Sequence, residues 1–430
     1  MERELYKNLL EWKKSRINMP YMLVGVRQTG KTYLLTEFCK KEFENYVYIN
    51  LDNMEDIREI FENTKIPEEI IRNIEAILNI EIDVEKTIIF IDEIQVSERA
   101  ISTLKYFCES EQPYKIVCAG SLLGVKINRF KSSFPVGKVW IDYLYPMNFS
   151  EFLKAIGEEN ILKLIEESYY NMKPMLEVTH KKALNLYYDY MCIGGMPMAI
   201  LDYIENKKNI LRTNDDLHRI MITSYLADME KYTENTESIK NNKIYNSIPM
   251  QLGKENKKFK YSLVEKSARS REYESSIDWL ISSNMILKCQ GIKTPKTPLK
   301  VNTEDNFKLY LSDIGILRVL AKIEKNEILL NKNMIYKGVL AENYVAEILY
   351  AKNRELYYWQ LGSQYEVDFL INIDGDVIPV EVKASDNTTS NSLNYYINRF
   401  KPEYSIRIST KNFGFSNKIK SVPLYAVHLI

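Results

Sequence analysis

The stretch YMLVGVRQTGKTYLLTEF, residues 21–38, decides the first domain of this chain. It begins as a short apolar run, continues as a loop of small and polar residues, and ends in a helical pattern. Gly25, Gly30, Lys31 and Thr32 satisfy the spacing GxxxxGK[ST]. Glycine lets backbone N–H groups wrap around a phosphate, and the helix that follows adds the positive end of its dipole. The stretch therefore predicts a phosphate-binding loop between a strand and a helix.

The expected ligands of this loop are ATP and Mg²⁺. Lys31 would contact the β- and γ-phosphates and take part in catalysis, and Thr32 would bind Mg²⁺. The residues expected to bind the nucleotide are Gly25, Val26, Arg27, Gln28, Thr29, Gly30, Lys31, Thr32 and Tyr33.

Two carboxylates follow a second apolar run, TIIFIDEIQ at residues 87–95. Asp92, at the end of the expected strand, would hold Mg²⁺ through water. Glu93 could polarise the attacking water as the catalytic base. Alone, a DE pair after a strand indicates little, because charged strand ends are common. Together with the phosphate-binding loop, the pair predicts phosphoryl transfer.

Two further polar features leave alternatives open. Ser121 follows the apolar run KIVCAG and could sense the γ-phosphate of the nucleotide, or could be a helix N-cap. Arg129 or Lys131 could reach a neighbouring subunit's nucleotide as an arginine finger, or could be an ordinary surface charge.

Apolar runs alternate with helical patterns through the first third of the chain. The expected strands are Tyr21–Val24, Tyr46–Asn50, Thr87–Ile91, Lys115–Ala119 and Lys138–Leu144. Continuous apolar strands are typical of a parallel sheet that is covered on both faces. The expected fold class is therefore α/β, with a P-loop NTPase sheet, a helical lid, winged-helix-like helices and a restriction-endonuclease-like α/β module. The expected domain boundaries are 1–150, 151–238, 239–320 and 330–430.

The composition excludes broad classes of function. The 58 basic residues balance the 58 acidic ones, so there is no overall electrostatic attraction to nucleic acid or to an anionic membrane. No apolar stretch approaches the 18 residues of a membrane span, and the five cysteines are widely spaced. We expect a cytoplasmic protein that has no contact with a membrane.

The order of a P-loop, a DE strand, a serine strand and a helical region resembles an AAA-plus ATPase. The strings GVRQTGKT, FIDEIQ, AGSLLG, IGGMPMAI, SYLADMEKY, FKLYLSDIGIL and GVLAENYVAEIL are similar to one prokaryotic branch, in which a domain of unknown function, DUF4143, follows the ATPase. The resemblance covers essentially the whole chain. It implies ATP hydrolysis at a site between subunits, and it leaves the arginine finger unsettled.

The middle of the chain predicts three helices, 244–252, 262–266 and 272–283, and then two strands, 285–289 and 307–311. This order is similar to a winged helix. The basic residues gathered here are Lys254, Lys257, Lys258, Lys260, Lys266, Arg269 and Arg271, with Phe259 and Tyr261 among them. They could neutralise DNA phosphates, or they could form the solvated face of a lid or protein-docking module.

Near the end, YEVDFLINIDGDVIPVEVK predicts a hairpin, with its turn at the DG step. Its Asp368, Glu381 and Lys383, together with Glu342 on a preceding helix, resemble a PD-(D/E)XK nuclease core. The resemblance implies that Glu342, Asp368 and Glu381 bind Mg²⁺ and that Lys383 orients water. Asp368, Glu381 and Lys383 would then be catalytic. The alternative is a retained fold that does not cleave.

Two functions follow from these patterns. The first is an ATP-hydrolysing machine, a homo-oligomer, whose C-terminal module engages or cuts DNA. The second is a nucleotide-switched regulatory protein, in which an inactive nuclease-like module docks a protein partner.

Overall fold

The structure is a computed structural model of the whole chain. It describes residues 1–121, 124–125, 134–299, 306–330, 334–353, 355–362, 364–384 and 391–430. The chain forms two compact units. The N-terminal unit contains Glu2–Tyr145 and Ser282–Asn284, and the C-terminal unit contains Pro146–Ile281 and Met285–Ile430. Among the described residues, no helix is long and apolar enough to cross a membrane.

The N-terminal unit is a parallel sheet of five strands in the order β2-β3-β4-β1-β5. Its strands are β1 (Tyr21–Val24), β2 (Asn45–Asn50), β3 (Thr87–Asp92), β4 (Lys115–Gly120) and β5 (Trp140–Tyr143). Every strand expected from the sequence is present, with its ends shifted by a few residues at most. All the pairs are parallel, so the α/β prediction for this part is confirmed.

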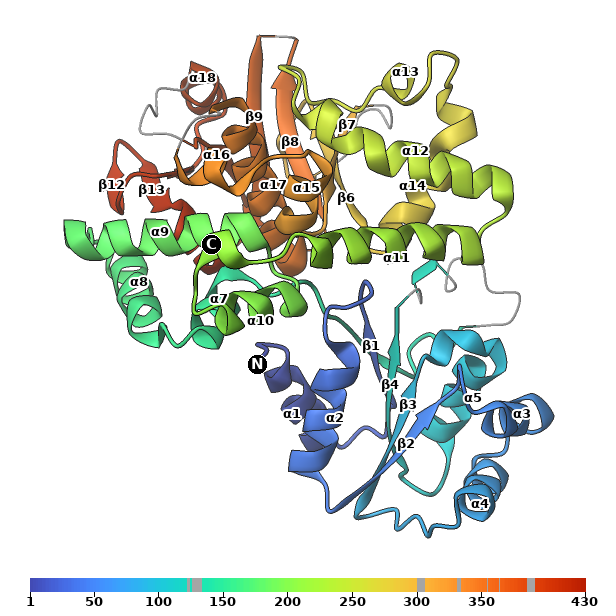
Figure 1. The fold of residues 1–430 in the computed structure, drawn as a ribbon. Coiled ribbons are helices and arrows are strands. Elements are labelled where there is room, and N and C mark those ends of the chain that lie inside the picture. The colour runs from blue at the N-terminus through green and yellow to red at the C-terminus, as the bar shows by residue number, and fades with distance from the viewer. Residues whose placement is uncertain are drawn as a thin grey trace. The chain divides into compact units, whose positions relative to one another are not determined.

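Helices cover both faces of this sheet, as Figure 1 shows. They are α1 (Tyr6–Lys14), α2 (Lys31–Glu42), α3 (Glu55–Asn63), α4 (Pro67–Leu78) and α5 (Glu98–Glu109). Alternate residues of a strand enter opposite layers: Met22 packs in the layer of α3, α4 and α5, whereas Leu23 packs in the layer of α1 and α2. The continuous apolar runs of the sequence therefore reflect strands that are buried on both sides.

The C-terminal unit begins with helices. They are α7 (Phe149–Ala155), α8 (Glu159–Asn171), α9 (Glu177–Ile193), α10 (Pro197–Glu205), α11 (Asp216–Tyr232), α12 (Asn235–Leu252), α13 (Tyr261–Val264) and α14 (Ser270–Ser282). Later helices are α15 (Ile314–Leu320), α16 (Lys325–Leu329), α17 (Met334–Asn353) and α18 (Asn391–Phe400). The three helices expected in the middle of the chain correspond to α12, α13 and α14.

The second sheet has eight strands in the order β12-β13-β11-β10-β9-β8-β6-β7. They are β6 (Ile286–Ile292), β7 (Phe307–Leu311), β8 (Leu356–Leu361), β9 (Tyr365–Ile373), β10 (Asp376–Val382), β11 (Ser405–Ser409), β12 (Gly414–Ser416) and β13 (Ile419–Pro423). Strand β6 pairs antiparallel with β7 and parallel with β8. The expected two-stranded wing is thus the edge of a sheet that continues to the end of the chain, across the expected boundary between 320 and 330.

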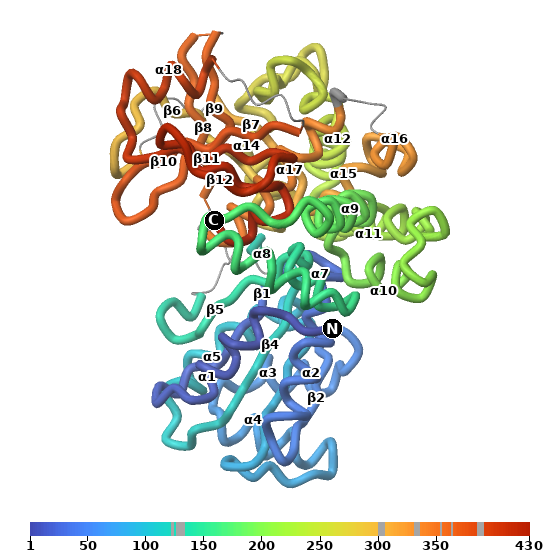
Figure 2. Tube along the Cα trace, turned by 90° about the vertical axis from the view of Figure 1, so that its left-hand side faces the viewer, coloured from blue at the N-terminus to red at the C-terminus, as the bar shows by residue number. Residues whose placement is uncertain are grey.

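The expected hairpin is confirmed as β9 and β10, which pair antiparallel around Asp374 and Gly375. Both turn residues have positive φ, 52° and 93°. The DG step supplies these because glycine accepts this region freely and aspartate is among the residues that tolerate it best. Helix α17 packs on the sheet, with contacts to β6, β7, β8 and β10 (Figure 2). This packing brings the helix that carries Glu342 to the strands that carry Asp368 and Glu381.

Candidate functional site

The phosphate-binding loop of the N-terminal unit joins β1 to α2. A side chain at Gly25 would place its Cβ 2.3 Å from the carbonyl oxygen of Leu144, so only glycine fits there. Gly30 and Gln28 have φ values of 91° and 67°. Helix α2 then begins at Lys31. The loop therefore needs glycine at position 25, where the backbone lies close to Leu144, and it has two residues, Gln28 and Gly30, in the left-handed region.

Lys31 lies inside the loop that it is expected to serve. Its side chain is buried, and its ammonium group donates to the carbonyl oxygens of Gly25 and Val26, at 2.9 Å each. Thr29 closes the turn by donating to the same Val26 carbonyl at 3.0 Å. The positive charge is therefore at the centre of the loop, where a bound phosphate would need it.

The carboxyl end of β3 brings the expected magnesium residues together. Thr32 Oγ1 donates to Asp92 Oδ2 at 2.9 Å, across sixty positions of sequence. The Tyr48 hydroxyl donates to the same carboxylate oxygen at 3.0 Å. A hydroxyl and a carboxylate in contact are oxygen donors of the kind that Mg²⁺ prefers.

Glu93 follows in an unusual backbone conformation. Its φ is 52°, in the left-handed region that non-glycine residues seldom adopt. Its carboxylate accepts a hydrogen bond from the amide of Gln95, which is completely buried. Asp92 and Glu93 are thus neighbours whose carboxylates have different partners.

Ser121 lies at the end of β4, beside the loop. Gly120 pairs with Val24, so Ser121 and Gly25 leave neighbouring strands at the same edge of the sheet. The Ser121 hydroxyl is buried and has no hydrogen-bond partner among the described residues. A buried hydroxyl without a partner costs free energy, which an additional ligand group would recover. Arg129 and Lys131 lie outside the described residues.

Arg3 supports the loop, although no motif in the sequence pointed to this residue. It is 8% exposed, and its guanidinium donates to the carbonyl oxygens of Thr29 at 2.8 Å and Tyr145 at 2.6 Å. One side chain thus joins the phosphate-binding loop to the segment that follows β5.

A second group of charged residues lies in the C-terminal unit, where α17 meets the sheet. Glu342 is buried and accepts hydrogen bonds from Lys308 at 3.0 Å and from the Tyr310 hydroxyl at 2.6 Å. Lys257 also donates to it. Burial opposes ionisation, but the two ammonium groups outweigh it and hold the pKa of Glu342 below its usual range.

Lys308 is the central cation of this group. It is completely buried on β7 and also binds Glu366, at 2.6 Å. Burial disfavours its charge, but the carboxylates of Glu342 and Glu366 outweigh that cost and raise its pKa. A lysine inside the apolar run FKLYL was the signal that could have revealed this network, because a buried lysine needs a partner.

Asp368 lies on β9, and Glu381 lies on the adjacent strand β10. Between Tyr357 and Trp359 the register of β8 against β9 shifts: Tyr357 pairs with Leu370 and Trp359 with Val367, so β9 carries an extra residue there. Such bulges re-aim side chains. Here the Asp368 carboxylate accepts the N–H of Val382 at 2.8 Å.

Neighbouring carboxylates affect the protonation of Asp368. Burial, together with the carboxylates of Glu381 and Glu342, raises the pKa of Asp368 to about 8. Lys383 binds Glu381 at 2.8 Å. Among the described residues, however, no three histidine, cysteine or acidic side chains form a group that could hold a metal ion as arranged. Lysines contact two of the predicted acids: Lys257 and Lys308 bind Glu342, and Lys383 binds Glu381.

Two of the sequence segments that carry the family resemblance, FKLYLSDIGIL and IGGMPMAI, are in buried contact. Asp313, in FKLYLSDIGIL, accepts the N–H groups of Gly195 at 2.7 Å and Ile316 at 2.9 Å. Gly195 belongs to IGGMPMAI. Burial raises the pKa of Asp313 to about 6. These hydrogen bonds link the start of α15 to the segment between α9 and α10.

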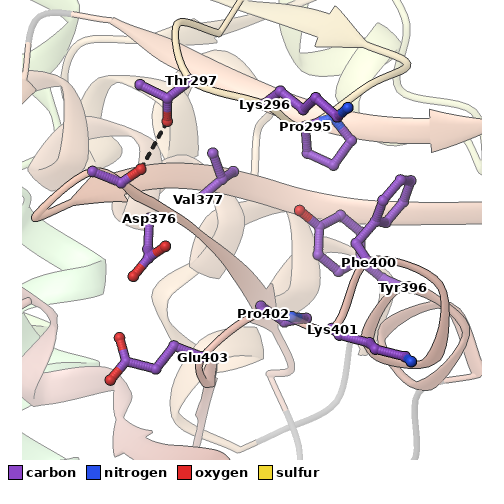
Figure 3. Close-up of a pocket in the computed structure, with 11 residues that line it drawn as sticks. Pro295, Lys296, Thr297, Asp376, Val377, Tyr396, Phe400, Lys401, Pro402 and Glu403 are labelled. Atoms are coloured by element: carbon purple, nitrogen blue, oxygen red, sulfur yellow. Dashed lines mark hydrogen bonds between the residues drawn. The ribbon is translucent and has the colours of Figure 1, made fainter.

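A separate cavity of about 280 Å³ opens on the C-terminal unit (Figure 3). Tyr396, Phe400 and Pro402 contribute apolar walls, and Thr297 donates to the Gly375 carbonyl at 2.9 Å. None of the site residues expected from the sequence lines it.

Comparisons with known families agree with the two-part architecture. Residues 18–153 match a family described as an AAA domain, residues 184–327 match a domain of unknown function, DUF8612, and residues 337–427 match DUF4143. The chain therefore contains an AAA-type P-loop ATPase domain followed by DUF4143. The expectation of these two parts is confirmed.

Individual relatives are distant. An uncharacterized protein of Methanocaldococcus jannaschii is 24% identical over 358 residues, which cover 81% of this chain and 71% of that protein. A Walker-type ATPase of Pyrococcus abyssi has a TM-score of 0.44 at 14% identity, over 74% of this chain and 95% of its own. The ORC2 protein of Aeropyrum pernix has a TM-score of 0.36 at 13% identity, over 76% and 92%.

Proposed function

We propose that the N-terminal unit binds ATP and hydrolyses it to ADP and phosphate. The observation that carries the proposal is the contact between Thr32 Oγ1 and Asp92 Oδ2 at 2.9 Å, beside a loop with Lys31 at its centre. Lys31 and Thr32 from the loop and Asp92 from the end of β3 thus meet at the carboxyl edge of one parallel sheet, where open α/β folds bind their ligands.

Each residue has a distinct role in this proposal. The backbone N–H groups of residues 25–33 and the Lys31 ammonium hold the phosphates. Glu93 accepts the proton of the attacking water, and Gln95 holds the Glu93 carboxylate until then. Ser121 offers its buried hydroxyl to the terminal phosphate.

Thr32 and Asp92 would hold Mg²⁺, directly and through water. The fit rests on their oxygen donors, which already lie in contact. When bound, the ion supplies positive charge that offsets the charge developing on the phosphate oxygens. Tyr48 steadies Asp92 from the neighbouring strand.

Two variants separate binding from turnover. Lys31→Ala should abolish nucleotide binding, because it removes the ammonium group of the loop. Glu93→Gln should bind ATP as wild type does and lose turnover by about 10² to 10⁴-fold, the usual contribution of a general base. Glu98→Gln, a partly buried acid a few residues on, is the matched control. Wild-type turnover in Glu93→Gln would remove Glu93 from the mechanism.

We also propose that the ATP site is shared between subunits of a homo-oligomer, with Arg129 as the candidate arginine finger. Light scattering of Glu93→Gln with ATP should then reveal an assembly larger than a monomer. A monomer with bound ATP would contradict a shared site.

A second candidate function concerns the C-terminal unit, which we propose engages DNA and cleaves it with Mg²⁺. The favouring observations are that the carboxylates of Glu381 and Glu342 help to raise the pKa of Asp368 and that Lys383 forms an ion pair with Glu381 at 2.8 Å. Lys257, one of the basic residues of the middle segment, touches Glu342. This ion pair supports a connection between the candidate DNA-contacting residues and the nuclease-like residues.

The test is a gel assay of plasmid and linear DNA with Mg²⁺, for wild type and Lys383→Ala. Cleavage that Lys383→Ala abolishes supports the nuclease. If neither protein cleaves and DNA does not change the ATPase rate, the regulatory alternative is favoured, in which the module docks a protein partner.

A further inference from the structure

Tyr48 lies on β2, the edge strand of the N-terminal sheet, next to the strand that ends in Asp92. Its ring packs edge-on against Phe90, with the ring centroids 5.2 Å apart, and the residue is 39% exposed. A phenylalanine would make the same ring contact. What the tyrosine adds at this position is therefore its hydroxyl group.

That hydroxyl group reaches the carboxylate that the proposed function assigns to Mg²⁺. It donates to Asp92 Oδ2 at 3.0 Å, the same atom that accepts from Thr32 Oγ1 at 2.9 Å. The other carboxylate oxygen, Oδ1, accepts the N–H of Glu93 at 3.0 Å. Asp92 is 4% exposed, so these three donors, rather than bulk water, set the orientation of its carboxylate.

The three donors differ in their relation to the ion. Thr32 is itself an expected ligand of Mg²⁺, so its contact with Asp92 is the one that changes when the ion binds. Tyr48 and the N–H of Glu93 are not ligands. They leave one donor on each oxygen of Asp92, and such outer hydrogen bonds are what fix the orientation of a ligating carboxylate.

Asn50 sets the direction of the Tyr48 hydrogen bond. Its Oδ1 accepts the N–H of Asp52 at 2.9 Å, and its Nδ2 donates to the Tyr48 oxygen at 3.4 Å. A backbone N–H can only donate, so it fixes which end of the Asn50 amide faces Tyr48. The phenol accepts from Asn50, and its own proton is left for the carboxylate of Asp92, which can only accept.

We propose that Tyr48 is a positioning residue for the Mg²⁺ site: its hydroxyl group holds the Asp92 carboxylate in its ligating orientation, and Asn50 orients that hydroxyl group. The inference rests on the proposed ATP site of the N-terminal unit. Because Tyr48 acts through Asp92, its loss should weaken what the ion contributes and leave the contacts of the loop with the phosphates unchanged.

The test measures, by calorimetry on the full chain, the affinity for a non-hydrolysable ATP analogue with Mg²⁺ and again with EDTA. The ratio of the two affinities reports what the ion adds. Tyr48→Phe keeps the ring on Phe90 and removes the hydroxyl group. It should lower the ratio about tenfold, the lower end of the cost of removing a hydrogen-bond partner from a metal ligand. The affinity with EDTA should equal that of wild type.

Tyr46→Phe is the matched control. Tyr46 lies two residues earlier on β2, so its side chain is on the same face as that of Tyr48, and it is 38% exposed. No hydrogen bond joins its hydroxyl group to another residue in the part of the chain that the structure describes. The ratio for Tyr46→Phe should equal that of wild type.

A double variant tests the role of Asn50. Tyr48→Phe with Asn50→Ala should have the ratio of Tyr48→Phe alone, because Asn50 acts through the phenol. A further loss in the double variant would show that Asn50 acts on the site by another route, and its assigned role would be wrong.

Turnover gives a second readout. The Mg²⁺ concentration for half-maximal ATP hydrolysis should rise about tenfold in Tyr48→Phe, and turnover at saturating Mg²⁺ should return to that of wild type. Turnover that stays low at saturating Mg²⁺ would mean that the chemical step itself needs Tyr48, which contradicts a positioning role.

The other outcomes separate this inference from the proposed function. Equal losses of affinity with Mg²⁺ and with EDTA, or a Tyr48→Phe protein that does not fold by circular dichroism, would make Tyr48 a structural residue. An unchanged ratio would remove it from the site, so each of these results overturns the inference. The proposed function fails differently: a wild-type protein that does not bind the analogue has no ATP site, and one whose affinity is the same in EDTA has no ion for Asp92 to hold.

Discussion

Replacing Lys308 with methionine should destabilise the C-terminal unit more than any other loss of a single lysine in this network. Methionine nearly fills the space of the lysine stem, so the main loss is the charge. Lys308 is completely buried and contacts Glu342 at 3.0 Å and Glu366 at 2.6 Å. After the change, Glu342 stays buried with Lys257 and Tyr310 as its recorded partners.

The magnitude follows from burial. Removing one partner of a buried ion pair costs about 3–5 kcal/mol, because the remaining charge is left in a medium that solvates it poorly. Lys257 compensates part of the charge on Glu342, so we expect about 3 kcal/mol, or roughly a hundredfold in the unfolding equilibrium. Glu366 is 30% exposed, so water replaces much of what it loses.

The assay is urea unfolding followed by tryptophan fluorescence. The chain has four tryptophans. Changing Trp12 and Trp140 to phenylalanine leaves Trp279 and Trp359, both in the C-terminal unit, as reporters. Lys288→Met, on the neighbouring strand and half-buried, is the matched control and should change stability by less than about 1 kcal/mol.

A double variant isolates the charge effect. Lys308→Met with Glu342→Gln should recover most of the lost stability, because the uncompensated carboxylate is gone. If Lys308→Met costs no more than Lys288→Met, or if the double variant is no more stable than Lys308→Met alone, the buried ion-pair argument is wrong.

Three further predictions follow from individual contacts. Gly25→Ala should abolish nucleotide binding measured by calorimetry, because its Cβ would lie 2.3 Å from the Leu144 carbonyl oxygen and the loop must shift. Arg3→Met should weaken ATP binding measured by calorimetry about tenfold, the equivalent of one lost charged hydrogen bond to the Thr29 carbonyl. Asp368 has a folded-state pKa of about 8, above its ordinary value near 4, so the folded chain holds a proton that the unfolded chain has released and stability should fall as pH rises from about 4 to 8. Asp368→Asn should flatten that slope in urea unfolding at several pH values, and an unchanged slope would contradict the assignment.

The sequence determined the parts of this protein that depend on local pattern. The phosphate-binding loop was visible because Gly25 and Gly30 answer backbone constraints that act within a few residues. The five parallel strands were visible because burial on both faces leaves continuous apolar runs. The hairpin turn was visible because Asp374 and Gly375 both take positive φ.

Tertiary structure determined the features that depend on contacts between segments far apart in the sequence. That Thr32 contacts Asp92 could be expected from the paired motifs, but Arg3 and Tyr48 carry no motif and enter through packing. Strands β6 and β7 were expected as a separate wing, yet β6 also pairs with β8, and local periodicity cannot predict this pairing.

The charged residues of the C-terminal unit illustrate the same limit. The sequence supplied Glu342, Asp368, Glu381 and Lys383 as one constellation, but it could not show that Lys257 and Lys308 would lie against Glu342. Partner choice among buried charges depends on the three-dimensional distances between them and on how well each is solvated. These quantities exist only once α17 is packed on the sheet that contains β7, β9 and β10.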